Sequence, residues 1–369
     1  MRAVGIDPGT MSFDLCGISD KDGVILDVTI PSSKLNGDPD VLFDLLDSIS
    51  PLDLIVGHSG LGTSFKTGKE LNEMAIAEML LAPKKELESQ NTPELIQAMY
   101  KLYRDPKIKD HPFVFIPGVI HLPTVPEYRK ANKIDMGTAD KLCCAVLAVK
   151  DQAEALNIPY DETSFILVEV GFGFNAALLV ENGRVLDGVG GTVMGPGFLA
   201  QGSVDAELAR ILYYIAEAPT RLTFASGGVV SISGNDHLTP EEFTKNRKRY
   251  PVAWEAYIEG VLKAISALAK KGTREVLLSG RLSSYGAILD ELDRCPLPIR
   301  RLNGLKGVKT AKHAAQGAAI LADGLAGGEY QELVDTMNIK EAKGTILDHI
   351  HFQGIGKNSL ELLEKIWES

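Results

Sequence analysis

The chain has 369 residues and a formal net charge of −11, so it is long enough for two domains with separate hydrophobic cores. This acidic balance argues against a nucleic acid partner, because polyanions are repelled wherever no local basic patch outweighs it. No apolar run reaches the ~20 residues that cross a bilayer, and a strand pattern begins directly at the N-terminus; we therefore expect a cytoplasmic protein without membrane contact.

Strand and helix patterns alternate through the first half of the chain. A meander of three strands is predicted first and two further buried strands follow it, at residues 3–6, 13–18, 24–30, 52–56 and 113–116. Apolar residues at helical spacing predict helices over 41–49, 69–81, 93–104 and 137–150. The last of these contains Cys143 and Cys144, and we expect all four cysteines to be buried and reduced.

The second half repeats this arrangement. Strands are predicted at 165–170, 175–180, 184–186 and 275–278, and helices at 205–217, 252–271, 311–325 and 359–367. Two meanders, each followed by helices, indicate an internally duplicated α/β protein. The boundary between the halves is predicted near residues 150–161, where a helical pattern gives way to a polar segment, and the residues after Gly328 have the character of a polar appendage.

One motif occurs twice and carries the functional prediction. Residues 7–12 (Asp-Pro-Gly-Thr-Met-Ser) and residues 169–175 (Glu-Val-Gly-Phe-Gly-Phe-Asn) each join two apolar strands through an acidic residue and a glycine turn. We call them the first and second glycine hairpins. Backbone N–H groups exposed in such turns bind phosphate, and a neighbouring carboxylate can hold Mg²⁺ through water. Two hairpins that face each other would therefore grip a polyphosphate from both sides.

This pattern predicts specific phosphate and metal ligands. Asp7 and Glu169 are the predicted catalytic carboxylates and Mg²⁺ ligands, and the alternative for both is a structural role, for Asp7 as a turn carboxylate that accepts backbone hydrogen bonds. The predicted phosphate-binding residues are Gly9, Thr10, Ser12, Gly171, Gly173 and Asn175.

A dinucleotide site is the competing interpretation of the second glycine hairpin. Gly171, Gly173 and Ala176 have the spacing of that fingerprint, but the fingerprint requires a helix next. Residues 176–184 have a strand-and-turn pattern instead, and no Walker A sequence is present. We therefore reject a dinucleotide site.

The order of these motifs resembles the acetate and sugar kinase, Hsp70 and actin superfamily. Within it, the chain is most similar to acetate and butyrate kinases and to archaeal relatives of unassigned activity, described as predicted butyrate kinases. The resemblance extends from Val4 to about Gly328. Besides the two hairpins, the matching segments are residues 55–61, 183–187, 195–198 and 277–281, together with two hinge helices at 137–150 and 313–328.

The resemblance implies a duplicated ribonuclease H-like (actin-like) α/β fold with a central interdomain cleft. It implies an N-terminal domain of residues 1–150 plus about 311–345, a nucleotide-binding C-terminal domain of 151–310 and an appendage of 346–369. ATP and Mg²⁺ are the implied cofactors. The residues that match the family's adenosine motif and the loop after its second phosphate motif are Gly280, Arg281, Gly195 and Gly197, and they are expected to bind the nucleotide.

The acceptor site is where this sequence departs from the carboxylate kinases. Those enzymes carry a histidine where this chain has Glu169, and two of their arginines fall on His58 and near Gln201 here. Asp140, early in the first hinge helix, matches the place where family enzymes often have a carboxylate that orients the acceptor; the alternative is stabilisation of the helix dipole, worth ~0.3–1 kcal/mol. The other candidate acceptor-binding residues are His58, Lys66, Glu127 and Arg129.

We therefore predict an ATP-dependent small-molecule kinase whose acceptor, by resemblance, is a short-chain carboxylate such as butyrate. The alternatives are a kinase of sugars or other hydroxyl compounds, a non-catalytic nucleotide-binding protein, and a nuclease of the related resolvase fold. The acidic charge and the second glycine hairpin disfavour the nuclease. The expected partners are ATP and a small-molecule acceptor, without nucleic acid or membrane, and a homodimer is one expected assembly.

Overall fold

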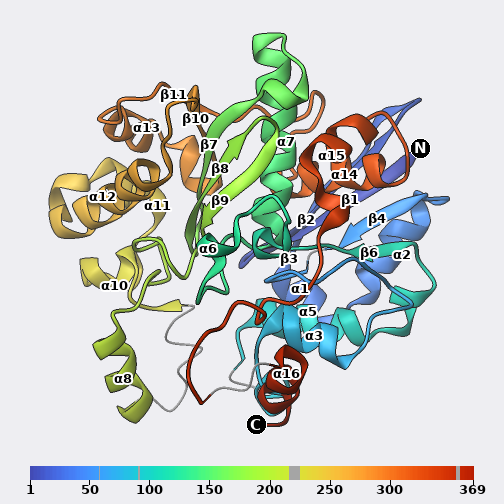
Figure 1. Ribbon diagram of the computed structural model, residues 1–369, viewed down its shortest axis with the longest axis horizontal. Helices are drawn as coiled ribbons and strands as arrows, with labels where there is room; N and C mark the ends of the chain where they lie inside the picture. The colour runs from blue at the N-terminus through green and yellow to red at the C-terminus, as the bar shows by residue number, and fades with distance from the viewer. Residues whose placement is uncertain (58, 90–91, 216–224, 355–357) are drawn as a thin grey trace.

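The computed structural model describes residues 1–57, 59–89, 92–215, 225–354 and 358–369, and it contains two mixed β-sheets flanked by helices (Figure 1). The first sheet has the strand order β3-β2-β1-β4-β6-β5 and the second has the order β11-β10-β7-β8-β9. The strands of the first sheet are β1 (Arg2–Pro8), β2 (Ser12–Ser19), β3 (Gly23–Pro31), β4 (Leu54–Gly57), β5 (Lys66–Thr67) and β6 (Phe113–Phe115). Those of the second are β7 (Ser164–Val170), β8 (Asn175–Glu181), β9 (Arg184–Val189), β10 (Glu275–Ser279) and β11 (Ile299–Arg301).

The two sheets repeat one topology, apart from the extra edge strand β5. In each, the first strand of an antiparallel meander also pairs in parallel with a later strand: β1 with β4, and β7 with β10. Both meanders have a register irregularity between their second and third strands, at Gly17/Ile18 and at Leu179/Val180. The predicted internal duplication is therefore confirmed.

Strand burial explains which strands could be predicted. The central strands β1 and β7 are buried almost throughout, and strands covered on both faces have continuous apolar sequences that stand out in the chain. Strand β11 was not predicted because two of its three residues are arginines. It forms because its backbone pairs in parallel with β10.

Helices cover the outer faces of both sheets and fill the space between them. Those before the second sheet are α1 (Ser32–Gly37), α2 (Asp40–Ser48), α3 (Glu73–Leu80), α4 (Lys84–Leu87), α5 (Glu94–Arg104), α6 (Glu127–Lys130) and α7 (Ala139–Leu156). The later ones are α8 (Ala206–Ile215), α10 (Val229–Ser233), α11 (Pro240–Lys245), α12 (Pro251–Leu268), α13 (Gly286–Leu292), α14 (His313–Leu325), α15 (Gln331–Met337) and α16 (Ser359–Glu368). The end of the predicted helix 205–217 lies outside the described residues.

Helices α7 and α14 lie between the two sheets and contact each other (Figure 1). Helix α14 also packs on β1, and α7 also packs on β7 and β8. The backbones approach closely because glycines lie at the contacts. A Cβ at Gly317 of α14 would lie 1.8 Å from the carbonyl oxygen of Cys143 in α7, and a Cβ at Gly5 of β1 would lie 2.2 Å from the backbone nitrogen of Ala319 in α14. These are the two helices that the resemblance identified as hinge helices.

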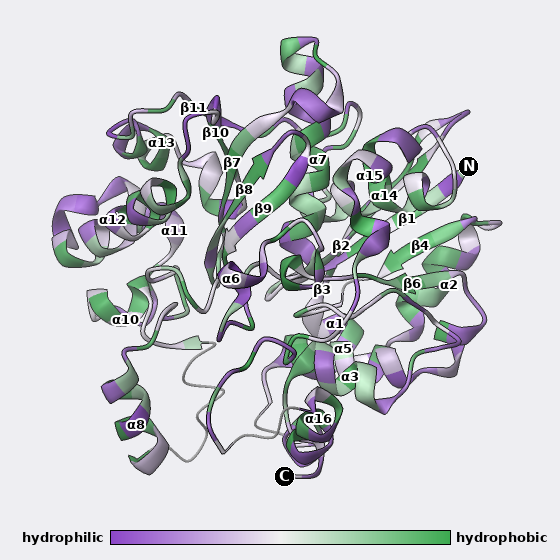
Figure 2. Ribbon diagram, in the orientation of Figure 1, coloured by the Kyte–Doolittle hydropathy of each residue, from purple (hydrophilic) through white to green (hydrophobic). Residues whose placement is uncertain are grey.

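Buried apolar residues form a core on each side of the helix pair and a third around it. Against the second sheet, the aromatic residues Phe243, Trp254 and Tyr257 form an interlocked group. Against the first sheet, Phe115 packs edge-on to Tyr103. Figure 2 shows β4 as a hydrophobic strand; its Ile55 belongs to this first core, whereas Val56 belongs to the central one. Both sheets are thus rigid platforms for the loops at their strand ends.

The C-terminal residues pack back onto the side of the first sheet. Leu333 and Val334 of α15 are buried in the central core, and α16 lies against α3. Trp367 of α16 is buried, and its ring lies 6.3 Å from that of Tyr100 in an edge-on contact. The residues after Gly328 are therefore not simply polar, because narrow apolar stripes on otherwise polar helices complete the core.

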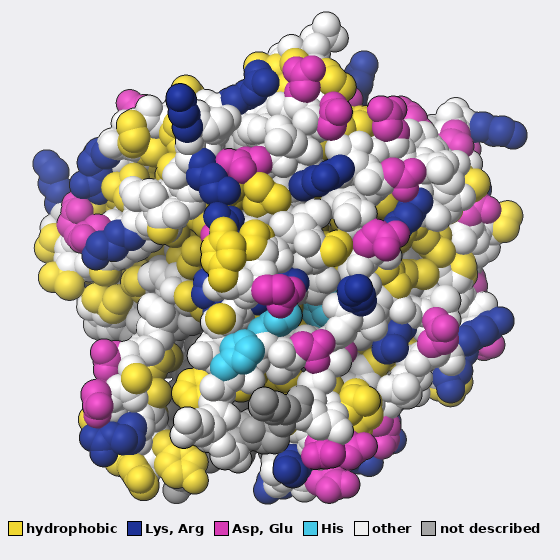
Figure 3. Space-filling view, in the orientation of Figure 1, with side chains coloured by type: hydrophobic (Ala, Val, Ile, Leu, Met, Phe, Trp, Pro, Cys, Tyr) yellow, Lys and Arg dark blue, Asp and Glu magenta, His cyan; other side chains and the backbone are white. Residues whose placement is uncertain are grey.

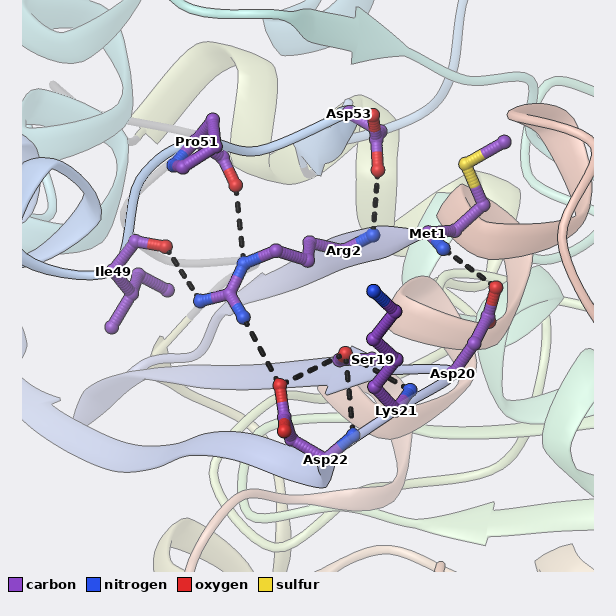
Figure 4. Close-up of polar contacts among 9 residues, drawn as sticks. All are labelled: Met1, Arg2, Ser19, Asp20, Lys21, Asp22, Ile49, Pro51 and Asp53. Carbon is purple, nitrogen blue, oxygen red and sulfur yellow. Dashed lines mark hydrogen bonds and ion pairs between the residues drawn. The ribbon is translucent and has the colours of Figure 1, made fainter.

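One end of the first sheet is held by polar contacts around Arg2 (Figure 4). The Arg2 guanidinium donates to the carbonyl oxygens of Ile49 and Pro51 at 2.9 and 3.2 Å and reaches Asp22 at 3.4 Å. The Arg2 backbone N–H donates to Asp53 at 2.7 Å. These bonds join the start of β1 to the turn after β2 and to the segment before β4, which fixes the register of the strand that ends in the first glycine hairpin.

The surface in Figure 3 carries Lys and Arg side chains interspersed with Asp and Glu, without a continuous basic area on that face. Within the described ranges, no helix combines the length and the apolar character that crossing a membrane requires.

Candidate functional site

The two glycine hairpins have the same turn. In the first, the Gly9 N–H donates to the Ser12 carbonyl oxygen at 2.8 Å, and in the second the Gly171 N–H donates to the Phe174 carbonyl oxygen at 3.1 Å. The strands beside each turn pair from matching positions, with Asp7 opposite Asp14 and Glu169 opposite Ala176. The repeat seen in the sequence is therefore a repeat of backbone geometry.

The hairpins also lie beside each other, although they belong to different sheets. A Cβ added at Gly173 would lie 3.6 Å from the hydroxyl oxygen of Thr10, so the two turns are close neighbours. Gly9 and Thr10 are not buried, so the first turn stays accessible. The structure thus brings together the predicted phosphate-binding residues of both halves of the chain.

A narrow pocket lies next to the first glycine hairpin, and in this structure its free space does not admit a water molecule. It is formed where the carboxyl ends of the parallel strands β1 and β4 meet the first residues of α7 and α14. Asp7 and Asp140 are its two acidic residues, and the remainder of its lining is Ile6, Val56, Gly57, Ile116, Ala139, Cys143 and Ala314. Two carboxylates predicted to be catalytic, which are 133 positions apart in the sequence (140 − 7), therefore line the same small pocket.

Asp140 and Glu169 share one lysine. Lys141 forms ion pairs with both of them, at 2.9 Å to Glu169. Asp140 also accepts a hydrogen bond from the hydroxyl of Thr138, the residue before α7. The three ionic side chains are largely buried, so this cluster connects the start of α7 to the acidic residue of the second glycine hairpin inside the protein.

Burial and mutual charge set the protonation of this cluster. Burial raises the pKa of Glu169, and Asp140 raises it further, although Lys141 acts in the opposite direction. Burial alone would lower the pKa of Lys141, but Asp140 and Glu169 outweigh it and hold that pKa well above its usual value. Lys141 is therefore a permanent cation at this site, while Glu169 takes up a proton more readily than an exposed glutamate.

A chain of weaker polar contacts continues from Glu169 to the start of α14. The Cys144 thiol lies 3.8 Å from Glu169 and the same distance from the Ser279 hydroxyl. The Ser279 hydroxyl is 2.9 Å from Nδ1 of His313. All four cysteines are buried and free, as predicted, and burial raises the pKa of the Cys144 thiol well above its usual value.

His313 makes folding stability depend on pH. Burial, with Arg301 adding repulsion, lowers its pKa to about 4, from 6.5 in the absence of these effects. Between these two values the unfolded chain binds a proton that the folded chain does not, so we expect stability to fall as pH decreases from about 6.5 towards 4, by roughly 2–3 kcal/mol for this group. The measurement is the urea midpoint at pH 7 and pH 4.5. In His313→Asn the decrease should be smaller by that amount, and an unchanged decrease would contradict the assignment.

The predicted nucleotide residues gather around the second glycine hairpin. Gly280 has a positive φ of 87°, and a Cβ there would lie 2.5 Å from the carbonyl oxygen of Val170, so only glycine allows this approach. The Arg281 guanidinium lies 5.1 Å from the centre of the Phe172 ring. Arg281 is exposed and can move to stack on a planar ligand.

The other predicted residues near this hairpin support it from behind. A Cβ at Gly197 would lie 2.2 Å from the carbonyl oxygen of Gly173, and Gly195 packs against Gly260 of α12. Asn175 is buried; its side chain donates to the carbonyl oxygen of Pro196 and accepts from the Tyr257 hydroxyl, both at 3.2 Å. In this structure Asn175 holds the loop after the meander rather than facing the pocket.

None of the predicted acceptor-binding residues that the structure describes lines the pocket. His58 lies outside the described residues, and Lys66 is in the edge strand β5, paired with Phe115. Arg129 bonds to Asp187 at 3.2 Å and to the Leu186 carbonyl oxygen at 2.9 Å, whereas Glu127 pairs with His349 at 3.1 Å. The two α6 side chains therefore connect α6 to β9 and to the C-terminal segment.

Sequence reasoning missed several polar residues that the fold brings to this region. Lys141, Ser279, Lys312 and His313 are directly adjacent to predicted residues or helices, but adjacency alone does not show where a side chain points. Of these four residues, only Lys141 could have been singled out from the sequence, because it is a cation near the start of a helix that is otherwise mostly apolar.

The donor set determines which metal the site can hold. In the part of the chain that the structure describes, no group of three or more His, Cys, Asp or Glu side chains is arranged to bind a metal ion. Mg²⁺ does not require one, because it keeps several waters and takes one or two carboxylates together with substrate phosphates. Asp7 fits that requirement, whereas Glu169 is already paired with Lys141.

Comparison with known proteins gives the family. A family model described as "Protein of unknown function (DUF1464)" matches residues 5–352. The chain belongs to this family. A search of curated protein sequences gives no significant match.

Solved structures show what the fold is. The chain is similar to a propionate kinase from Francisella tularensis, with a TM-score of 0.61, 12% identity, and coverage of 86% of this chain and 98% of that one. It is also similar to the acetate kinase of Entamoeba histolytica, with a TM-score of 0.51, 12% identity, and coverage of 80% of this chain and 86% of that one. For the acetate kinase of Porphyromonas gingivalis the TM-score is 0.51 and the identity 16%, with coverage of 79% of this chain and 86% of that one. This DUF1464 member therefore has the duplicated actin-like, ribonuclease H-like fold, as predicted. At such identities the likeness shows the fold alone.

Proposed function

We propose that this protein is an ATP-dependent phosphotransferase that acts on a small molecule. The main support is the pair of glycine hairpins, which share one turn geometry and lie close together beside a pocket lined by Asp7 and Asp140. The fold, which is like that of enzymes named acetate and propionate kinases, is consistent with this activity.

Each part of the site has a role in this proposal. The backbone N–H groups of the two hairpins bind the phosphates, and Gly9 and Gly173, which are not buried, leave the main chain open to them. Mg²⁺, when bound with ATP, would neutralise part of the charge of the phosphates. Asp7 holds this ion through water, and Arg281, next to Gly280 at the end of β10, stacks on the base of the nucleotide.

The acceptor follows from the lining of the pocket. Similarity of the sequence to butyrate kinases favours a short-chain carboxylate, and the pocket would have to open to admit it. The two carboxylates in the lining favour a hydroxyl compound instead, because a negatively charged acceptor gains less beside them, although Lys141 neutralises part of the charge of Asp140. With a hydroxyl acceptor, Asp140 would orient and deprotonate the attacking oxygen.

The deciding experiment combines nucleotide binding with an acceptor panel. Calorimetry with Mg·ATP tests binding, and a coupled assay measures ADP formation with acetate, propionate, butyrate, glucose, glycerol and ethanolamine. We expect micromolar to millimolar ATP affinity and ADP formation that depends on one acceptor class. Absence of ATP binding would overturn the proposal, and ATP binding without ADP formation over a broad panel would replace it with a non-catalytic nucleotide-binding role.

A further inference from the structure

Lys312 lies on the first glycine hairpin, although it comes from the other end of the chain. Its ammonium donates to the Ser12 hydroxyl at 2.9 Å and forms an ion pair with Asp14, on the strand that leaves the turn. A Cβ at Gly9 would lie 3.1 Å from the same nitrogen. The ammonium is therefore positioned directly against the glycine turn predicted to bind phosphate.

The backbone before Lys312 is fixed by the same meander. The Asp27 carboxylate of β3 accepts hydrogen bonds from the backbone N–H groups of Lys309, Thr310 and Ala311, at 2.7–3.1 Å. These bonds lower the pKa of Asp27 even though partial burial acts to raise it. Lys312 follows this segment immediately and precedes α14, so its position relative to the first glycine hairpin is set by β3 rather than by a flexible loop.

The side chains of Lys312 and its ion-pair partner Asp14 differ in solvent exposure. Asp14 is 1% exposed and is also held by the Thr29 hydroxyl at 2.7 Å, whereas the Lys312 side chain is 40% exposed. An ammonium has three N–H donors, and a lysine held on one side by a buried carboxylate can still donate to a ligand on its open side. Asp14 therefore orients the ammonium of a lysine whose side chain stays partly exposed.

The charge around the pocket explains what such a cation can do. Asp7, Asp140 and Glu169 contribute carboxylates, and Lys141 is already shared between two of them. A polyphosphate entering this region therefore meets mostly negative side chains. A partly exposed ammonium at the turn offsets some of that repulsion at the point where the phosphates would bind.

We propose that Lys312 is a phosphate-binding residue: its ammonium, oriented by Asp14, contacts the outer phosphates of the nucleotide on the first glycine hairpin. This inference rests on the proposed function for the identity of the ligand, but it concerns a residue on α14's N-terminal side that the hairpin motifs do not contain. The chemical class that Lys312 recognises is a polyphosphate, and a nucleoside monophosphate does not reach it.

The test uses the different changes in Mg·ATP affinity that are expected when each member of the Lys312–Asp14 ion pair is replaced. Lys312→Gln removes the cation, so Mg·ATP affinity measured by calorimetry should fall at least tenfold. Asp14→Asn keeps the cation and releases it from its carboxylate, so affinity should stay the same or rise severalfold. Lys312→Arg should restore most of the affinity, and AMP affinity should change in none of the three. A pair with a purely structural role would instead lose affinity equally in Lys312→Gln and Asp14→Asn.

Matched controls and a second ligand make the outcomes decisive. Lys107 pairs with Asp40 at 2.8 Å and its side chain is 42% exposed, so Lys107→Gln controls for loss of a paired lysine of similar exposure.

Unchanged ATP affinity in Lys312→Gln, with ATP bound by the wild type, would overturn this inference and leave the proposed function standing. Tripolyphosphate separates the two proposals: if the wild type binds it through Lys312 but does not bind ATP, the nucleotide assignment fails while the phosphate role of Lys312 stands. If neither ligand binds the wild type, both fail. The double variant Asp14→Asn/Lys312→Gln removes both charges together and keeps the inference testable if the single lysine variant unfolds.

Discussion

Asp7→Ala is expected to reduce ATP-dependent phosphoryl transfer by at least about 100-fold while leaving the fold intact, a loss typical of removing one preorganised charge-stabilising group. Asp7 is buried at the carboxyl end of β1 and lines the pocket beside the first glycine hairpin. Its backbone pairs with Asp14 across the strand, and this pairing does not depend on the side chain. The variant therefore removes the carboxylate without removing the strand, and the measurement is ADP formation with the best acceptor.

Asp44→Ala is the matched control for this variant. Asp44 is an exposed aspartate of α2 that does not line the pocket, and its loss should leave ADP formation unchanged. Thermal melts of both variants separate lost chemistry from lost folding. Activity within a factor of three of the wild type in a folded Asp7→Ala protein would mean that Asp7 only holds the turn.

Lys141→Met is expected to destabilise the folded state by about 3–5 kcal/mol, the usual cost of removing one partner from a buried ionic group. Lys141 neutralises Asp140 and Glu169, and without it two largely buried carboxylates face each other. Both would then resist ionisation, because like charges in a poorly solvated site raise each other's pKa. The measurement is the urea unfolding midpoint at neutral pH, where the loss should be largest.

Adding Glu169→Gln to this variant should recover part of the lost stability, because one of the two unpaired charges is removed. Lys245→Met, in the exposed pair with Glu241, should leave the midpoint unchanged and controls for general effects of losing a lysine. A Lys141→Met protein with a wild-type midpoint, or a double variant less stable than the single one, would show that the cluster is hydrated and carries little of the folding energy.

Local sequence patterns were sufficient to predict a structural feature when that feature is formed by a few neighbouring residues. The turn of the first glycine hairpin needs only the glycine and the flanking strands, and its second copy was enough to predict the duplication from the sequence alone. The start of α7 was also predictable, from the apolar residues at helical spacing over 137–150. Strand β11 was not, because it depends on pairing with β10 rather than on its own residues.

Site residues were harder to predict because their roles depend on which strand ends and helix starts meet. Asp140 was proposed by resemblance alone, and its place beside Asp7 follows from the contact between α7 and the end of β1. Glu127 and Arg129 had the same standing in the sequence, yet the fold directs them to the C-terminal segment and to β9. Charge and spacing did not distinguish these cases.

The amino-acid sequence by itself determined the repeated strand–turn–strand units, the glycines that keep their turns open, and the acidic residue at each, since all of these follow from interactions within about ten residues. Only the tertiary structure decided that the two turns lie close together, that Lys141 is shared between Asp140 and Glu169, and that Lys312 lies on a turn some 300 positions earlier in the chain. The physical reason is that ion pairs and close backbone approaches act only over a few ångströms. Packing of α7 and α14 between the two sheets creates those distances, and no local pattern encodes them.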